Sequence, residues 1–108
     1  MIGGTRIIGG DKDDFVRGYK KGLIDAKGMI GNYSGLEEAY RSAGLAAVKL
    51  LGNDAVSDAE KAERAAYASA MMDVWQEVHS YYVFLGEELR AGWERIVLEQ
   101  IDDVMKNW

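Results

Sequence analysis

The chain has 108 residues, a usual size for one domain, and its 48% hydrophobic and 29% charged residues are typical of a globular protein. It contains no cysteine, which excludes disulfides and thiolate chemistry, and its net charge of −5 disfavours direct binding to nucleic acid or to a membrane surface. No apolar run approaches the ~18 residues needed to span a bilayer, so we expect a cytoplasmic protein.

Acidic residues gather where helices are predicted to begin. Carboxylates in a first helical turn interact favourably with unpaired backbone N–H groups, so these charges have a structural role. The pattern predicts an all-α fold, a compact bundle of three to four helices in one domain over residues 11–108. The residues concerned are Asp11, Asp13, Asp14, Glu37, Glu38, Asp58, Glu60, Glu87 and Glu88.

Residues 1–10 contain four glycines and are expected to form a flexible, Gly-rich N-terminal arm. Gly4 and Gly9 have the spacing of a phosphate-binding loop. Gly10 stands where that loop needs its lysine, so a phosphate site is disfavoured.

The first helix is predicted from about Asp13 to Ile30, because apolar residues recur there every three or four positions. A second row, Gly18, Gly22 and Ala26, follows a strict four-residue spacing. Glycine in a helix costs ~0.5–1 kcal/mol relative to alanine, which close approach of another helix would compensate. We expect this row to mediate self-association into a homo-oligomer.

The nine residues from Gly18 to Ala26, GYKKGLIDA, are similar in style to helices of small phage-encoded proteins. This resemblance identifies no particular family. It implies that a small regulator of phage type is one role to consider.

The second helix is predicted to begin after Ser34, with Glu37 completing a capping box, and to run to about Leu51. Its expected buried stripe is Leu36, Tyr40, Ala43, Ala47 and Leu50.

The third helix should start at a second capping box, formed by Ser57 and Glu60. Apolar residues follow it in heptad spacing, at Tyr67, Met71, Val74, Val78, Tyr81 and Leu85. At Gly86 we predict a break or kink, followed by a last helix that carries Leu89, Trp93, Ile96, Val97, Ile101, Val104 and Met105.

The sequence contains few residues in patterns typical of catalytic sites. His79 is the only histidine, and its helical neighbours at three and four residues are apolar, aromatic or amide side chains, so we expect it to serve packing. Adjacent acids on a helix diverge by ~100° and do not converge on one ligand. We therefore predict that the protein is not an enzyme and has no cofactor and no metal site. An enzyme built on His79 with distant acids is a third alternative.

Aromatic residues are concentrated in the C-terminal third. Trp75 and Tyr82 are expected in the core, and Tyr81, Phe84 and Trp93 cannot all share one inward face with them. One or two of these three should therefore be exposed, and tyrosine and tryptophan often anchor protein interfaces. The predicted partner-binding residues are Trp93, Tyr81, Phe84, Glu87, Glu88 and Trp108.

The expected function is that of a non-enzymatic protein-binding module, because the helices carry more apolar surface than so small a bundle can bury. The best hypothesis is a small phage-type regulator or inhibitor that docks on a host protein machine. Its acidic residues would block a groove meant for nucleic acid, so the partner would be a nucleic-acid-binding enzyme. The alternative is a structural, homo-oligomeric helical subunit without an inhibitory role.

Overall fold

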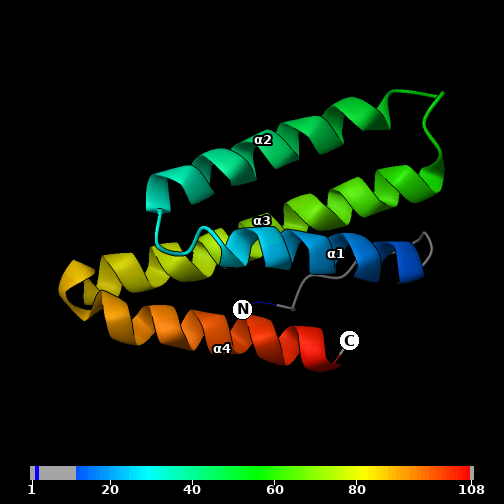
Figure 1. Ribbon diagram of the computed structural model, residues 1–108. Coiled ribbons are helices and arrows are strands. Elements are labelled where there is room, and N and C mark those ends of the chain that lie inside the picture. Colours follow the sequence, from blue (N-terminus) through cyan, green and yellow to red (C-terminus); the bar gives the residue numbers. More distant parts are fainter. Residues whose placement is uncertain (1, 3–11, 108) are drawn as a thin grey trace.

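The computed structural model describes residue 2 and residues 12–107, and it confirms the all-α architecture. The helices are α1 (Lys12–Lys27), α2 (Tyr33–Leu51), α3 (Asp58–Leu85), the 3-10 helix η1 (Glu87–Leu89) and α4 (Arg90–Asn107) (Figure 1). The expected flexible arm lies outside the described residues except for Ile2, which is buried in the core. Within residues 12–107 no helix combines the length and the apolar character needed to cross a membrane.

Helix α3 is the centre of the bundle, because it contacts each of the other three α-helices. In Figure 1, α2 lies on one side of the α1 and α3 pair, and α4 lies on the other. Helix α1 makes its most extensive contacts with α3 and a few with α4, whereas α2 packs chiefly on α3. The bundle therefore leaves much of the α2 surface uncovered.

The helix starts follow side-chain caps. Ser57 Oγ accepts a hydrogen bond from the Glu60 N–H at 3.2 Å, as predicted for the start of α3. The prediction of Ser34 as the cap of α2 is wrong, because Asn32 takes that position and its Oδ1 accepts from the Gly35 N–H at 3.0 Å. Asn32 lies before the first helical residue, Tyr33, whereas Ser34 is already inside the helix.

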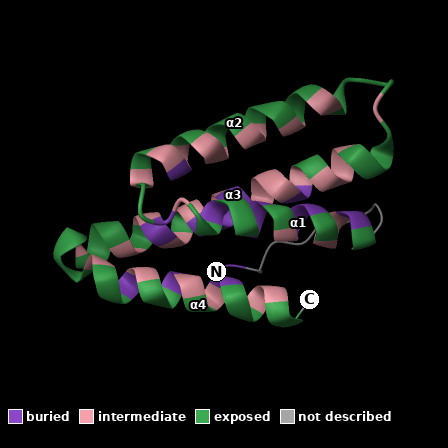
Figure 2. Ribbon diagram, in the orientation of Figure 1, coloured by how far each residue is buried: buried purple, intermediate pink, exposed green. Residues whose placement is uncertain are grey.

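The core is formed mainly by buried residues of α1, α3 and α4, which Figure 2 colours purple. Tyr19, Leu23 and Ala26 of α1 are fully buried, in line with the three- and four-residue recurrence of apolar residues predicted for this helix. In α2 only Leu36 is buried, while Tyr40, Ala43, Ala47 and Leu50 are half-buried. The described buried set is Ile2, Tyr19, Leu23, Ala26, Ile30, Leu36, Ala66, Ala70, Met71, Val74, Val78, Trp93, Val97 and Ile101.

The glycine row lies against α3 of the same chain. A Cβ added at Gly18 would stand 2.1 Å from the backbone oxygen of Glu63, and one at Gly22 would stand 2.6 Å from that of Tyr67. The predicted close approach of a helix is therefore correct. Packing within the chain buries Gly18, Gly22 and Ala26, so the close approach needs no second copy, and their assignment to self-association stays a prediction.

We expect Gly18→Ala to lower the free energy of unfolding by about 1–3 kcal/mol, since its methyl group would collide with the α3 backbone. Gly44→Ala, in the middle of α2, is the matched control, because a Cβ there meets no atom within 4 Å. The control should be stabilised by about 0.5–1 kcal/mol through better helix propensity. Urea unfolding followed by circular dichroism measures both. Equal effects of the two substitutions would contradict the packing of α1 on α3.

Candidate functional site

The turn between α3 and α4 depends on Gly86. This residue has φ 75° and ψ 175°, a backbone conformation that is essentially restricted to glycine. Its N–H donates to the Tyr82 carbonyl oxygen at 3.0 Å and ends α3, after which η1 leads into α4. The predicted break at Gly86 is thus confirmed.

Apolar and acidic side chains share the surface of this turn. We define the turn surface as Val83, Phe84, Leu85, Glu87, Glu88 and Leu89, all of which are exposed. Phe84 has 84% of its surface accessible, the highest value among the exposed large hydrophobic residues of the described chain. Figure 2 shows that the turn is almost entirely solvent-accessible. Four large apolar side chains exposed within seven residues make this turn a candidate contact site.

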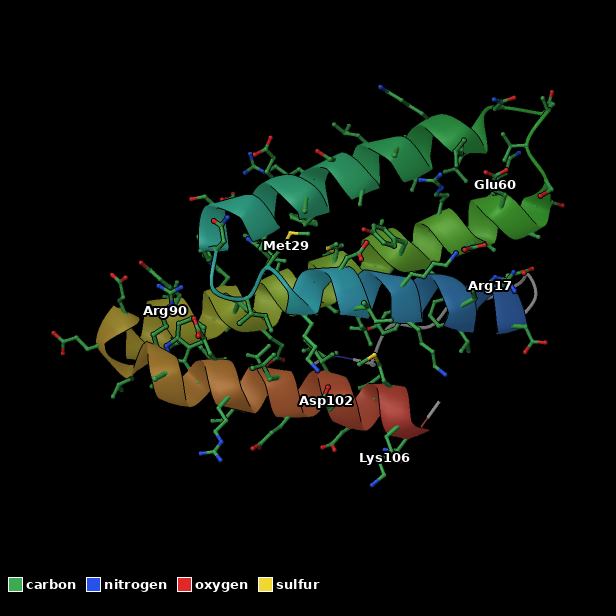
Figure 3. All side chains as sticks on the ribbon, in the orientation of Figure 1. Arg17, Met29, Glu60, Arg90, Asp102 and Lys106 are labelled. Carbon is green, nitrogen blue, oxygen red and sulfur yellow. The ribbon has the colours of Figure 1, made fainter. Side chains whose placement is uncertain are left out.

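Arg90 connects the turn to the rest of the bundle (Figure 3). Its Nη2 donates to the carbonyl oxygen of Gly31 in the loop between α1 and α2, and its Nε donates to Glu94 Oε1 at 2.5 Å. Glu87 Oε1 lies 3.6 Å from Arg90 Nη1. The segment 87–90 contains two carboxylates and one guanidinium, so the turn has a net charge of −1.

The structure separates the aromatic residues that were predicted to bind a partner. Trp93 is only 2% exposed, and its Nε1 donates to the Gly86 carbonyl oxygen at 3.0 Å. The indole of Trp93 is therefore a core side chain that supports the turn from inside, and its burial disfavours the partner-binding role, which stays a prediction. Tyr81 is half-buried and stacks on Trp93, with ring centroids 6.2 Å apart. Phe84 is the exposed member, and Trp108 lies outside the described residues.

A column of stacked rings joins α2 to α3. His79 Nδ1 lies 2.5 Å from the Tyr33 hydroxyl, and the imidazole stacks on Trp75 with centroids 4.9 Å apart. Tyr82, expected in the core, is instead partly exposed at the end of this column, where it stacks on Tyr33 at 5.2 Å. These contacts hold the His79 ring between aromatic neighbours, a packing arrangement. The predicted second helix begins after Ser34 and leaves out Tyr33, so the sequence alone does not indicate that Tyr33 is the partner of His79.

A cleft of about 350 Å³ lies between α1 and α3, and sequence reasoning did not predict it. Lys21 Nζ bonds Glu63 Oε1 at 2.5 Å across it, and this bond holds the pKa of Glu63 below its usual value. Arg17 Nε also lies 3.4 Å from Glu63 Oε2. Opposite charges are paired across the cleft, so it serves the packing of α1 on α3. Its lining residues are Gly18, Lys21, Glu60, Glu63, Arg64 and Tyr67.

Two buried carboxylates also have local partners. Asp73 Oδ2 accepts from the Tyr19 hydroxyl at 2.5 Å, and Asp14 pairs with Arg17. The described residues contain no group of three or more histidine, aspartate or glutamate side chains that could hold a metal ion.

No protein-family model, no curated protein and no solved structure matches this chain. Among the described residues, the turn surface contains the most exposed large hydrophobic side chain, Phe84.

We expect Gly86→Ala to reduce the free energy of unfolding by about 1–3 kcal/mol, because alanine is strained at this positive φ. Gly92→Ala in α4 is the control, since a Cβ there meets no atom within 4 Å and the backbone is helical. Chemical denaturation measures both variants. If Gly86→Ala were as stable as the wild type, the turn would not need glycine.

Tyr67 provides a test by titration. Burial, together with its hydrogen bond to Asp25, raises the pKa of Tyr67 from 10.0 to about 12. The folded state therefore disfavours the tyrosinate form of Tyr67. The free energy of unfolding that the neutral Tyr67 contributes is present below pH 10 and is lost as the pH rises through about 12. Ultraviolet titration should show this late tyrosine and lose it in Tyr67→Phe. Asp25→Asn should lower the pKa of Tyr67, whereas Asp103→Asn on α4 should not. Titration of every tyrosine near pH 10 would contradict the contact.

Proposed function

We propose that this protein is a non-enzymatic protein-binding module whose turn surface docks on a basic, partly apolar groove of a nucleic-acid-binding protein. The observation that carries the proposal is the position of Phe84, fully presented at the end of α3 and followed within four residues by Glu87 and Glu88. The role that fits is that of a small regulator or inhibitor of phage type.

The apolar part of the turn surface provides binding energy. Transfer of one phenylalanine side chain from water into a pocket contributes about 1.5–3 kcal/mol. Val83, Leu85 and Leu89 are also exposed within five residues of Phe84, so the end of α3 and the turn offer further apolar side chains to a partner. Interfaces typically obtain most of their affinity from such a small central group.

The turn is already held in place before it binds. The Trp93 indole bonds the Gly86 carbonyl oxygen at 3.0 Å, and Arg90 bonds the Gly31 carbonyl oxygen. A surface that needs little ordering loses less conformational entropy on binding, so more of the contact energy appears as affinity.

The acidic residues define the class of partner. Glu87 and Glu88 are exposed in the same turn as Leu89, and the chain as a whole has a net charge of −5. A groove that binds nucleic acid is lined by lysine and arginine, which attract such a surface and accelerate association. The bound protein would then occupy the place of phosphates and exclude nucleic acid.

Affinity capture from bacterial lysate, followed by mass spectrometry, tests this proposal. The wild type should retain a nuclease or another nucleic-acid-binding protein at moderate salt, and single-stranded or duplex oligonucleotide should compete. Phe84→Ser should weaken binding about 10- to 100-fold, since about 1.5–3 kcal/mol of apolar burial is lost.

The double variant Glu87→Gln and Glu88→Gln should slow association and reduce its dependence on salt. Ile24→Ser is the matched control, because Ile24 is an exposed apolar residue on α1, away from the turn. Capture of no nucleic-acid-binding protein, or equal capture by Phe84→Ser and the wild type, would overturn the proposal.

A further inference from the structure

A long internal part of the chain contributes no buried residue to the core. Between Leu36 in α2 and Ala66 in α3, every residue is half-buried or exposed. Figure 2 shows the connection between α2 and α3, and the helix ends beside it, in green and pink. Burial of apolar surface is the main favourable contribution to folding, so this end of the bundle is the least stabilised by packing.

The first half of α2 is nevertheless held on α3. Leu36 is fully buried, and the Tyr33 hydroxyl lies 2.5 Å from His79 Nδ1. One turn further along, Tyr40 stacks on Trp75 with ring centroids 5.0 Å apart. These three contacts fix α2 on α3 up to about residue 43.

The second half of α2 has no comparable contact. Leu45, Val48 and Leu51 expose 64%, 65% and 64% of their surface. Among the described residues, the hydrogen bonds that follow the helix are local, such as those from the Asn53 N–H to the Leu50 carbonyl oxygen at 3.1 Å and from the Ala55 N–H to Asn53 Oδ1 at 3.0 Å. The stability of this half therefore depends largely on its own helical hydrogen bonds.

Gly44 lies at the border between the two halves. A Cβ added there would meet no atom within 4 Å, whereas one at Gly18 would collide with the backbone of α3. Packing within the chain therefore does not require a glycine at position 44. Glycine destabilises a helix relative to alanine, because its backbone loses more conformational freedom, so α2 is intrinsically weakest at this border.

The start of α3 marks the other end of the weakly held part. Ser57 Oγ caps α3 by accepting from the Glu60 N–H at 3.2 Å. One turn later Glu63 Oε1 bonds Lys21 Nζ of α1 at 2.5 Å, and a Cβ at Gly18 would stand 2.1 Å from the Glu63 backbone oxygen. Helix α1 therefore holds α3 in place from its first turns onward.

We propose that residues 45–56 form a hinged segment that unfolds and refolds locally, with Gly44 as its hinge, while the rest of the bundle stays folded. Opening breaks the last helical turns of α2 and gives up only the half-buried contacts of Ala47 and Leu50. Leu36 and Tyr40 remain in place on α3. Local opening of this kind is expected where few apolar contacts are buried. The proposal is independent of the turn surface, because residues 83–89 take no part in it.

Hydrogen exchange of the native protein, followed by NMR and corrected for intrinsic rates, measures this opening. Backbone amides of residues 45–51 should exchange at least about tenfold faster than those of residues 71–78 at the centre of α3, which open only on global unfolding. Amides of residues 37–43 should be better protected than those of residues 45–51, since they lie on the held side of Gly44.

Two glycine variants separate local from global opening. Gly44→Ala should slow the exchange of residues 45–51 about two- to fivefold, the factor that corresponds to the helix propensity of alanine over glycine. Gly92→Ala is the matched control, because Gly92 is an exposed helical glycine in α4 where a Cβ would also meet no atom within 4 Å. The control should leave the exchange of residues 45–51 unchanged, since local opening does not depend on the stability of α4.

Limited proteolysis provides a second measurement. Lys49 is the basic residue of the hinged segment, so trypsin should cut after Lys49 before it cuts after Arg41 or Arg64. Gly44→Ala should slow this cut by the same factor as the exchange, and Gly92→Ala should not. Lys49→Gln should remove the cut and so confirm its position.

Three results would overturn the proposal. The first is equal protection of residues 45–51 and 71–78, which would mean that α2 opens only when the whole bundle unfolds. The second is equal slowing by Gly44→Ala and Gly92→Ala, which would mean the same. The third is exchange of residues 37–43 as fast as that of residues 45–51, which would show that Gly44 is not the hinge.

Discussion

The close contact of α1 with α3 at Gly18 and Gly22 is the constraint on which the rest of the structure depends. Because these glycines have no side chains, α1 lies directly against the backbone of α3. At this distance the Tyr19 hydroxyl reaches Asp73 across the core at 2.5 Å. A buried carboxylate is costly without a hydrogen bond, so this bond favours a single register between the two helices. Lys27 at the end of α1 also connects to α4, where its Nζ bonds Asp102 Oδ1 at 2.7 Å.

Helix α1 covers one side of α3, and the other two α-helices contribute different numbers of buried residues to the core. Helix α4 places Trp93, Val97 and Ile101 inside, whereas α2 buries only Leu36 and otherwise contacts α3 through half-buried residues. The stacked rings of Tyr33 and His79 close that contact at one end. The outward side of α2 is left apolar and uncovered. Exposed apolar side chains therefore lie both on α2 and at the turn, where Glu87 and Glu88 accompany them.

The turn shows how one residue can position a surface. Gly86 reverses the chain with a positive φ, and Trp93 then packs beneath it and bonds its carbonyl oxygen. The Trp93 indole is buried beneath the turn, whereas Phe84 faces solvent. Exposed apolar residues that are held rigidly are suited to recognition, because binding does not have to order them first. Residues close together in sequence therefore have both roles: Trp93 supports the turn from inside, and Phe84 is exposed on its surface.

The sequence by itself determined the helices, the capping role of Ser57 and the break at Gly86, because apolar period, side-chain caps and glycine act over a few residues. It also showed that Tyr81, Phe84 and Trp93 could not all face inward. Only the tertiary structure decided that Trp93 is buried and Phe84 exposed, since that depends on the direction in which α4 leaves the turn. The partner of the glycine row was equally undetermined, because helical spacing indicates a close neighbour without saying whether it belongs to the same chain or to another.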